Sequence, residues 1–266
     1  MNNRIKIIED LKNSIDQLSP RKEWNDKFIE KVKLDFTFYN NKLENNALSY
    51  GQTIRYLKEA VSPKGASVKD CLDVKNHFEV LDIVFKTYTK PLSENALLEL
   101  HGSLMKNHLQ WDEGVIYLPG KYKTGINYTV QSSGKLIQYL DSEKVPAAIK
   151  ELIEEINLGT ENSDPTSIEK HPVKIASLFH TRFLEIHPFE DGNGRICRIF
   201  TNLILLKTGY APVFIKPTDR MMYLNLFENA LNKENRMLDF FINQLIESLH
   251  AKLDFITKAQ EGTSPN

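Results

Sequence analysis

One stretch of the chain, His187-Pro-Phe-Glu-Asp-Gly-Asn-Gly-Arg-Ile-Cys-Arg198, gathers several side chains that could do chemistry together. His187 has an ordinary pKa of about 6.5, so it is largely neutral at pH 7 and can accept a proton from an attacking hydroxyl. Asp191 is a hard oxygen ligand of the kind that holds Mg²⁺ against phosphates. Arg195 and Arg198 lie three residues apart, so both can face one anion from the first turn of a helix.

The turn Asp191-Gly-Asn-Gly194 offers backbone groups to the same anion. Its glycines let the N–H groups of Gly192, Asn193 and Gly194 approach a ligand closely. A helix that begins here adds roughly half a positive charge at its N-terminus. We therefore expect a polyphosphate cradle with an imidazole at its edge. The alternative is an ordinary corner between two helices, with a buried histidine and two surface arginines.

Two helices must position this corner. The first has an apolar face with a spacing of three or four residues, made by Ile175, Leu178, Phe179, Phe183 and Ile186. Pro172 fits the first turn of this helix, and Pro188 cannot continue it, so we expect it to end at about His187. The second begins after the Gly-Asn-Gly turn and directs inward Ile196, Ile199, Phe200 and Leu203. Gly209 is suited to end it.

The stretch resembles, position for position, the pattern H-x-F-x-[D/E]-G-N-G-R-x-x-R of Fic-domain proteins. The resemblance implies transfer of AMP from Mg²⁺-ATP to a Ser, Thr or Tyr hydroxyl of a target protein. It makes His187 the general base, gives Asp191 the Mg²⁺ between the α- and β-phosphates, and packs Phe189 into the core. The other positions would hold the triphosphate, with the backbone of Gly192, Asn193 and Gly194 and the side chain of Arg195 at the α- and β-phosphates, and Arg198 at the γ-phosphate.

An upstream segment resembles the inhibitory helix [S/T]-x-x-x-E-[G/N] of many Fic proteins. A helix over about 36–46 is expected, because Phe36, Tyr39 and Leu43 share one helical face. Asn40 stands where Ser or Thr is usual, and Glu44 fits the pattern. The resemblance implies that Glu44 pairs with Arg198 and occupies the place of the γ-phosphate.

Two other interpretations of this inhibitory element stay open. An ordinary amphipathic helix would also carry an exposed glutamate. Near the C-terminus, Thr257-Lys-Ala-Gln-Glu-Gly262 fits the same pattern, so Glu261 is the alternative inhibitory residue.

Residues 114–140 interrupt the helical periodicity. Two strand-like runs, Ile126–Val130 and Leu136–Tyr139, predict a small hairpin. Gly120-Lys-Tyr-Lys-Thr-Gly125 resembles the start of the Fic flap, with Lys123 where Arg is commoner. We expect this flap to bind an extended segment of the target through Gly125, Ile126 and Asn127. A purely structural hairpin is the alternative.

A second pocket prediction concerns the nucleotide base. The spacing of Arg220 and Tyr223 resembles the Fic segment that lines the adenine pocket, so Tyr223 is expected to stack on the base. A tyrosine of the ordinary core would fit equally well.

The composition bounds the remaining possibilities. The chain has 266 residues, 41% of them hydrophobic, and a formal net charge of −1. No Lys/Arg block or long apolar run stands out, so neither nucleic acid nor a membrane is an expected partner. The two cysteines make no disulfide framework, which favours the cytoplasm. His171, His180 and His187 are too widely spaced for a zincin-type metal pair.

We therefore predict a mainly α protein, a Fic-type helical bundle with one small β-hairpin. Residues 1–90 would form an N-terminal helical region, 91–250 the catalytic core and 251–266 a tail. The cofactor is Mg²⁺, with ATP as co-substrate. The same site also fits a deAMPylase in which Glu44 orients water, or an ATP-sensing regulator with little catalysis. The target protein is not identifiable from the sequence, and assembly as a homo-oligomer is left open.

Overall fold

The computed structural model describes residues 2–19, 26–107, 111–112, 115–116, 118–130, 134–228 and 232–261. The helices of these residues are α1 (Asn2–Leu18), α2 (Asp26–Leu43), α3 (Tyr50–Glu59), α4 (Val68–Thr87), α5 (Glu94–Leu104), α6 (Val145–Glu161), α7 (Pro172–Ile186), α8 (Asn193–Lys207), α9 (Arg220–Glu228) and α10 (Lys233–Glu261). Short 3-10 turns precede α6, α7 and α9. No helix in this described part of the chain is long and apolar enough to span a bilayer.

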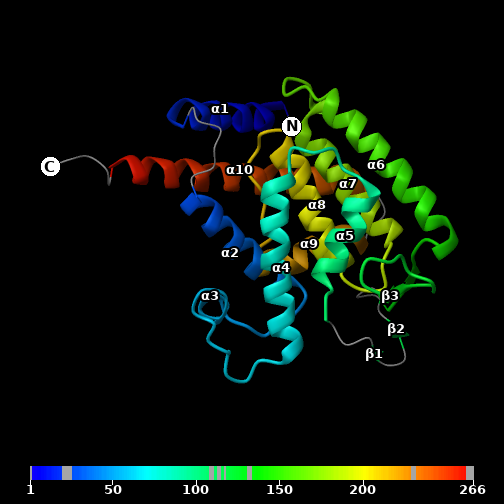
Figure 1. Cartoon of the computed structure of the whole chain (residues 1–266). Coiled ribbons are helices and arrows are strands. Elements are labelled where there is room, and N and C mark those ends of the chain that lie inside the picture. Colours follow the sequence, from blue (N-terminus) through cyan, green and yellow to red (C-terminus); the bar gives the residue numbers. More distant parts are fainter. Residues whose placement is uncertain are drawn as a thin grey trace.

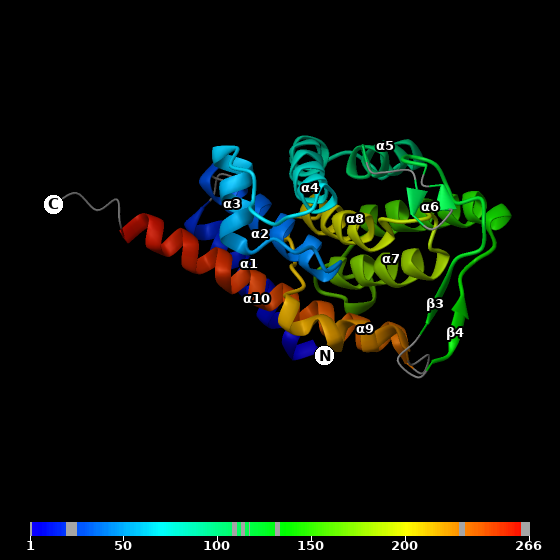
Figure 2. The same ribbon diagram turned by 90° about the horizontal axis from the view of Figure 1, so that it is seen from below.

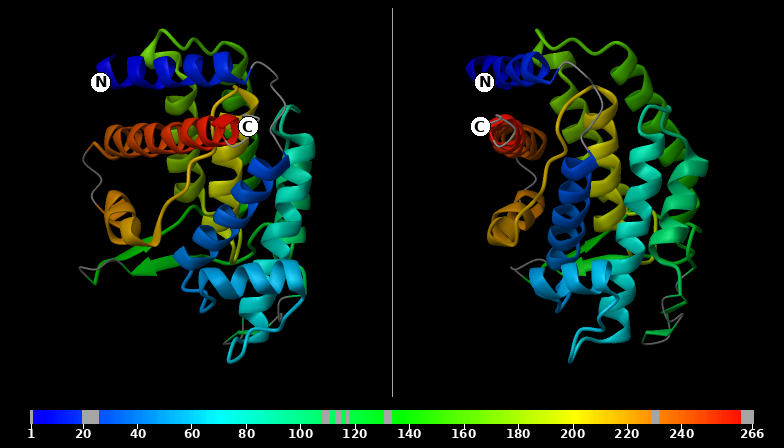
Figure 3. Two further views of the ribbon diagram at one scale, coloured as in Figure 1. Left: turned by 90° about the vertical axis from the view of Figure 1, so that its left-hand side faces the viewer. Right: turned by 60° about the vertical axis from the view of Figure 1, so that its left-hand side comes forward.

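Helices α7 and α8 form the centre of the bundle (Figure 1). Helices α6 and α10 both pack against α7, and α1 lies along α10 (Figure 3). Helices α5 and α2 contact α8, while α4 packs against both α2 and α5. The corner between α7 and α8 is thus enclosed by segments far away in the sequence.

The core explains why α8 is central. Its residues from Asn193 to Leu206 are buried on almost every side, as expected for a helix surrounded by others. The four residues predicted to face inward, Ile196, Ile199, Phe200 and Leu203, are at most 7% exposed. The expected helix boundaries are also confirmed: Pro172 starts α7, and Gly209 follows α8 with φ +85°. The predicted mainly helical fold is confirmed.

The expected hairpin is present and projects from the bundle beside α9 (Figure 2). Strands β3 (Tyr128–Val130) and β4 (Leu136–Gln138) pair antiparallel, with Tyr128 opposite Gln138. A further two-residue pair, β1 (Trp111–Asp112) with β2 (Val115–Ile116), was not predicted. The fold therefore contains one short strand pair more than expected.

Two boundaries differ from expectation. Helix α2 ends at Leu43, so Glu44 lies just beyond it in a turn that continues with Asn45 at φ +63°. Helix α10 runs past residue 250, where the tail was expected to begin, and ends at Glu261. The extension is stabilised because Leu253 and Ile256 pack against the core. The side chain of Glu261 lies outside the described residues.

Candidate functional site

The motif loop, residues 187–194, is held in shape by its own asparagine. Asn193 accepts a hydrogen bond from the Phe189 N–H at 2.9 Å and donates one to the Phe189 carbonyl at 2.7 Å. Phe189 is fully buried, as predicted. His187 ends α7 with φ +50°, which turns the chain away from the helix axis. The Asn193 side chain therefore bonds within the loop, and the Asn193 backbone N–H is left for a ligand.

Neighbouring side chains lie close to both glycines of the Gly-Asn-Gly turn. Gly192 has φ +78°, which favours glycine, and a Cβ there would lie 2.9 Å from the Met105 sulfur. A Cβ on Gly194 would lie 2.6 Å from Oε1 of Glu44 and 3.0 Å from Nη1 of Arg198. A carboxylate therefore sits directly against the N-terminal turn of α8, and a side chain at Gly194 would displace it.

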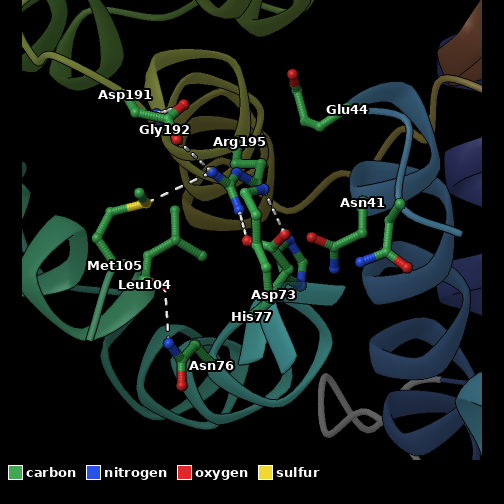
Figure 4. Close-up of polar contacts among 12 residues, drawn as sticks. Asn41, Glu44, Asp73, Asn76, His77, Leu104, Met105, Asp191, Gly192 and Arg195 are labelled. Carbon is green, nitrogen blue, oxygen red and sulfur yellow. Dashed lines mark hydrogen bonds and ion pairs between the residues drawn. The ribbon is translucent and has the colours of Figure 1, made fainter. Parts of the chain in front are cut away.

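Arg195 is buried and bound to acidic side chains (Figure 4). Its guanidinium forms an ion pair with Asp73 of α4, and Nη2 donates to Oδ2 of Asp191 at 3.4 Å. The same nitrogen lies 3.5 Å from the Met105 sulfur. The contact between Asp73 and Arg195 was not predicted from the sequence. Arg195 is thus fixed in place, rather than presented freely to an anion.

Arg198 contacts the residues of the proposed inhibitory element. Its Nη2 pairs with Oε1 of Glu44 and donates to the Asn40 carbonyl at 3.3 Å, while Nε donates to Oδ1 of Asn40. Burial alone would raise the pKa of Glu44, but the charges of Arg198 and Arg195 lower it overall. The carboxylate is therefore ionised at neutral pH and paired with Arg198. The Glu44–Arg198 contact is present where the resemblance implied it.

Asn40 replaces the usual Ser or Thr with a larger set of hydrogen bonds. Its Nδ2 lies 2.5 Å from Nε2 of His77 and donates to the Arg195 carbonyl at 3.3 Å. Nδ1 of His77 lies 3.0 Å from the Thr37 hydroxyl. Because an amide N–H can only donate, Nε2 of His77 accepts and Nδ1 carries the proton. Burial, followed by the charges of Arg195 and Arg198, lowers the pKa of His77 to about 3, so it is neutral.

The His187 imidazole lies at the opposite edge of the loop. Burial and the nearby charge of Lys123 lower its pKa to about 4, against the opposing influence of the Leu184 carbonyl, Asp191 and Glu44. The ring stacks on Tyr139 with centroids 3.8 Å apart. The imidazole is thus neutral, as a general base must be, and its Nδ1 atom is buried.

His101 of α5 connects the motif loop to the start of the flap, a role that was not predicted from the sequence. Its Nδ1 accepts from the Gly120 N–H at 3.0 Å, so Nε2 carries the proton and donates to the Asp191 carbonyl, also at 3.0 Å. The ring stacks on Phe189 with centroids 3.6 Å apart. No motif or spacing marked this residue, because its contacts are with segments distant in sequence. His108, further along the chain, lies outside the described residues.

The flap is attached to the motif loop by several hydrogen bonds. The N–H groups of Thr124 and Gly125 donate to Oε1 of Glu190 at 3.1 and 3.4 Å. The Asn127 amide donates to the Phe189 carbonyl at 2.9 Å. Ile126 is 51% exposed, so it is accessible to a partner. Glu190 occupies a variable position of the pattern, and for this reason its anchoring role was not predicted.

Tyr223 lies in the core, 3% exposed. Its ring packs against Phe227 and Phe240, and its hydroxyl lies 2.8 Å from Nε2 of His180. This placement is that of a tyrosine of the ordinary core. Stacking on an adenine ring would require the pocket to open.

Asp191 is the acidic side chain of the loop that is best placed for a cation. It is 40% exposed, and Oδ1 accepts only from the adjacent Gly192 N–H, at 2.6 Å. Among the described residues no three His, Cys, Asp or Glu side chains form a ready metal cluster. A single carboxylate beside a phosphate site suits Mg²⁺, which commonly takes one or two protein ligands together with substrate oxygens.

The site thus places the Glu44 carboxylate against the N-terminus of a buried helix, with the His187 imidazole at the other edge of the loop. Comparisons with known proteins identify the family. The model of the Fic/DOC family matches residues 91–205, from the start of the expected core through most of α8. Together with the solved relative described below, this match shows that the chain belongs to the Fic family.

Solved structures share the whole fold. A Fic-domain-containing signalling protein from Bacteroides thetaiotaomicron is 30% identical, with a TM-score of 0.80, over 96% of this chain and 97% of that one. Residues 134–508 of Fic-1 from Caenorhabditis elegans superpose with a TM-score of 0.73 over 96% of this chain and 71% of that one, at 19% identity. The second similarity is one of fold.

Curated relatives are similar at lower identity. The protein adenylyltransferase Fic of Nematostella vectensis is 25% identical over 225 residues, which are 82% of this chain and 48% of the relative. The protein adenylyltransferase fic-1 of Caenorhabditis elegans is 24% identical over 193 residues, 71% of this chain and 34% of the relative. The chain therefore spans half or less of the length of these relatives.

Proposed function

We propose that the protein is a protein adenylyltransferase, which transfers AMP from ATP to a Ser, Thr or Tyr hydroxyl of a target protein. The observation that carries the proposal is the position of the Glu44 carboxylate, which lies against Gly194 and is bound by Arg198. An anionic side chain thus occupies the cradle beside His187. A triphosphate offers the same charge and the same type of oxygen acceptor.

The cradle would bind ATP through groups that already stabilise an anion. The backbone N–H groups of Gly192, Asn193 and Gly194 lie at the N-terminus of α8, where the helix dipole favours negative charge. Arg198 would exchange Glu44 for the γ-phosphate, and Arg195 would add its charge from beneath. Base recognition would involve the region around Tyr223 after a rearrangement of the core.

Asp191 would hold the Mg²⁺ that accompanies ATP. Its partly exposed carboxylate keeps lone pairs free for a cation, because one oxygen bonds only its own loop and the other is 3.4 Å from Arg195. When bound, the ion would neutralise charge on the phosphates.

His187 would take the proton of the target hydroxyl as its oxygen attacks the α-phosphorus. The new P–O bond replaces the bond to pyrophosphate, which leaves with the electron pair. The low pKa of the imidazole, about 4, keeps it unprotonated before ATP arrives. A polyanion in the cradle would raise this pKa and strengthen the base, because opposite charge favours the protonated form. The target would bind at the exposed edge of the flap, near Gly125, Ile126 and Asn127.

Glu44 would keep the enzyme inactive. While it holds Arg198, ATP can bind only with its triphosphate displaced, and a misplacement of about 1 Å can cost roughly 100-fold in rate. Release of this contact would restore the γ-phosphate site. We further propose a cytoplasmic location, which the free thiols of Cys71 and Cys197 support.

The test is mass spectrometry of the Glu44→Gly protein after incubation with Mg²⁺ and each of the four nucleoside triphosphates. We expect a mass increase of one AMP with ATP, and none when His187→Ala is combined with Glu44→Gly. Absence of any nucleotide adduct would contradict the proposal. Tight ATP binding without transfer would favour a regulator, and release of AMP from a modified protein by the parent chain would favour a deAMPylase.

A further inference from the structure

Tyr139 covers one face of the His187 imidazole. The two rings are nearly parallel, with an angle of 11° and a centroid distance of 3.8 Å. Tyr139 follows β4, so it belongs to the hairpin and not to the motif loop. The final torsion of a histidine side chain has broad minima, so a neighbour stacked on the ring can decide which way its nitrogens point.

Tyr139 is itself held by the hairpin. Its N–H donates to the Asn127 carbonyl at 3.0 Å. The Asn127 amide in turn donates to the Phe189 carbonyl of the motif loop at 2.9 Å. The backbone of the tyrosine is therefore fixed at the base of the hairpin. The position of Tyr139 therefore depends on the flap, and the His187 imidazole stacks on the Tyr139 ring.

Lys123 supports the same arrangement from the other end of the flap. It is buried, its N–H donates to the Pro188 carbonyl at 2.9 Å, and Nζ donates to the Ile186 carbonyl at 3.4 Å. The backbone on both sides of His187 is thus bound by one flap residue. Nζ also lies 5.9 Å from the centre of the Tyr139 ring.

We infer that Tyr139 is a positioning residue for His187: its stacked ring fixes the plane of the imidazole, so the hairpin that receives the target also orients the base. This inference rests on the proposed transfer reaction only for the expected effect on kcat. The contact between the Tyr139 and His187 rings does not depend on that reaction. Binding of a target along the flap would therefore also act on His187 through Tyr139, in addition to the contact between the target hydroxyl and the imidazole.

The first experiment is NMR of the imidazole in protein with labelled histidine, with the His187 signals assigned by their loss in His187→Ala. A parallel ring at this distance shifts the imidazole protons upfield. We expect Tyr139→Leu to move the His187 signals downfield and Tyr139→Phe to leave them almost in place. The matched control is Tyr56→Leu, which removes a tyrosine from α3, away from the flap. Unchanged His187 signals in Tyr139→Leu would overturn the inference.

The second experiment measures self-AMPylation in the Glu44→Gly background. We expect Tyr139→Leu to lower kcat by up to about 100-fold, the cost of misplacing a catalytic group by about 1 Å, with the Kd for ATP unchanged. Tyr139→Phe should restore kcat. Full activity of Tyr139→Leu, or an equal loss in Tyr139→Phe, would contradict the positioning role. If Glu44→Gly itself transfers nothing, the proposed function fails, and the NMR shift still decides whether the rings of Tyr139 and His187 stack in solution.

Discussion

The motif loop has two sides that are built from different interactions. The helical side, formed by α2 and α4, contacts it through charges: Asp73 pairs with Arg195, and Glu44 with Arg198. The flap side, formed by the hairpin and α5, contacts it mainly through stacked rings: His101 stacks on Phe189, and Tyr139 on His187. Backbone hydrogen bonds complete the flap side, such as that between Lys123 and Pro188.

This difference separates the contacts that a phosphate can replace from the contacts that must remain when ATP binds. A carboxylate on an arginine can be replaced by a phosphate, because both are anionic oxygen acceptors of similar geometry. The triphosphate has no ring that could replace a stacked side chain. The helical side is therefore suited to regulation and nucleotide binding, and the flap side to holding the base. Variants on the two sides should affect different measurements.

The largest effect should separate catalysis from binding. In the Glu44→Gly background, His187→Ala should lower AMP transfer by about 10²–10⁴-fold, the usual contribution of a general base, and leave ATP binding unchanged. Arg198→Gln in the same background should instead weaken ATP binding, by about 1.5–3 kcal/mol for a lost charge-assisted hydrogen bond. Calorimetric titration with ATP and label transfer measure the two effects. If either variant changed ATP binding and AMP transfer equally, the two sides would not be functionally distinct.

The buried ion pair of the helical side should matter most for stability. Asp73→Asn leaves the Arg195 guanidinium buried without its main partner, so we expect a loss of about 3–5 kcal/mol in the free energy of unfolding. The control is Lys69→Gln, which removes the other partner of Asp73, 3.0 Å away. Lys69 is exposed, and its loss should cost at most about 1 kcal/mol. Chemical denaturation measures the free energy of unfolding of both variants. Equal losses would mean that the buried Asp73–Arg195 pair stabilises the fold no more than the Lys69–Asp73 pair does.

The corner between α7 and α8 was predictable because its signals are local. The periodic apolar residues and Pro172 define α7, and the glycines of the turn define where α8 begins. The long family pattern then assigned roles within the loop. The hairpin followed in the same way from alternating residues between glycines.

The partners of the corner were not predictable from spacing. Asp73 lies 122 residues from Arg195, and His101 is 90 residues from Asp191. Such contacts depend on how helices pack, which a local pattern does not encode. The Glu44–Arg198 pair is the exception, because a family resemblance supplied it. Tyr139 was recognised as part of a strand-like run, but nothing in the sequence indicated that it faces His187.

The substitution at Asn40 offers a smaller test of the helical side. Asn40→Ser should lose the bonds to His77 and to Nε of Arg198, at a cost of about 1–3 kcal/mol for buried partners left unsatisfied. Arg198 would be held less firmly, so basal self-AMPylation should rise, though less than in Glu44→Gly. Asn41→Ser is the matched control, since the Asn41 amide donates to the Thr37 carbonyl within α2 at 2.9 Å. An equal rise in self-AMPylation in both variants would mean that the bonds of Asn40 do not specifically hold Arg198.

The smallest effect concerns pH and compares one histidine from each side. Burial chiefly lowers the pKa of His77 to about 3 and that of His101 to about 4, whereas an unfolded histidine has a pKa of about 6.5. Below pH 6.5 the unfolded chain therefore binds protons that the folded chain does not, and stability falls as pH falls. Each histidine should contribute about 1 kcal/mol to the loss between pH 7.5 and 5.5. His77→Gln and His101→Gln should each reduce this pH dependence by that amount, whatever they do to stability at pH 7.5, as denaturant titrations at the two pH values will measure. A reduction in only one variant would show that the other histidine takes up a proton in the folded protein, and that the two sides differ in protonation as well as in charge.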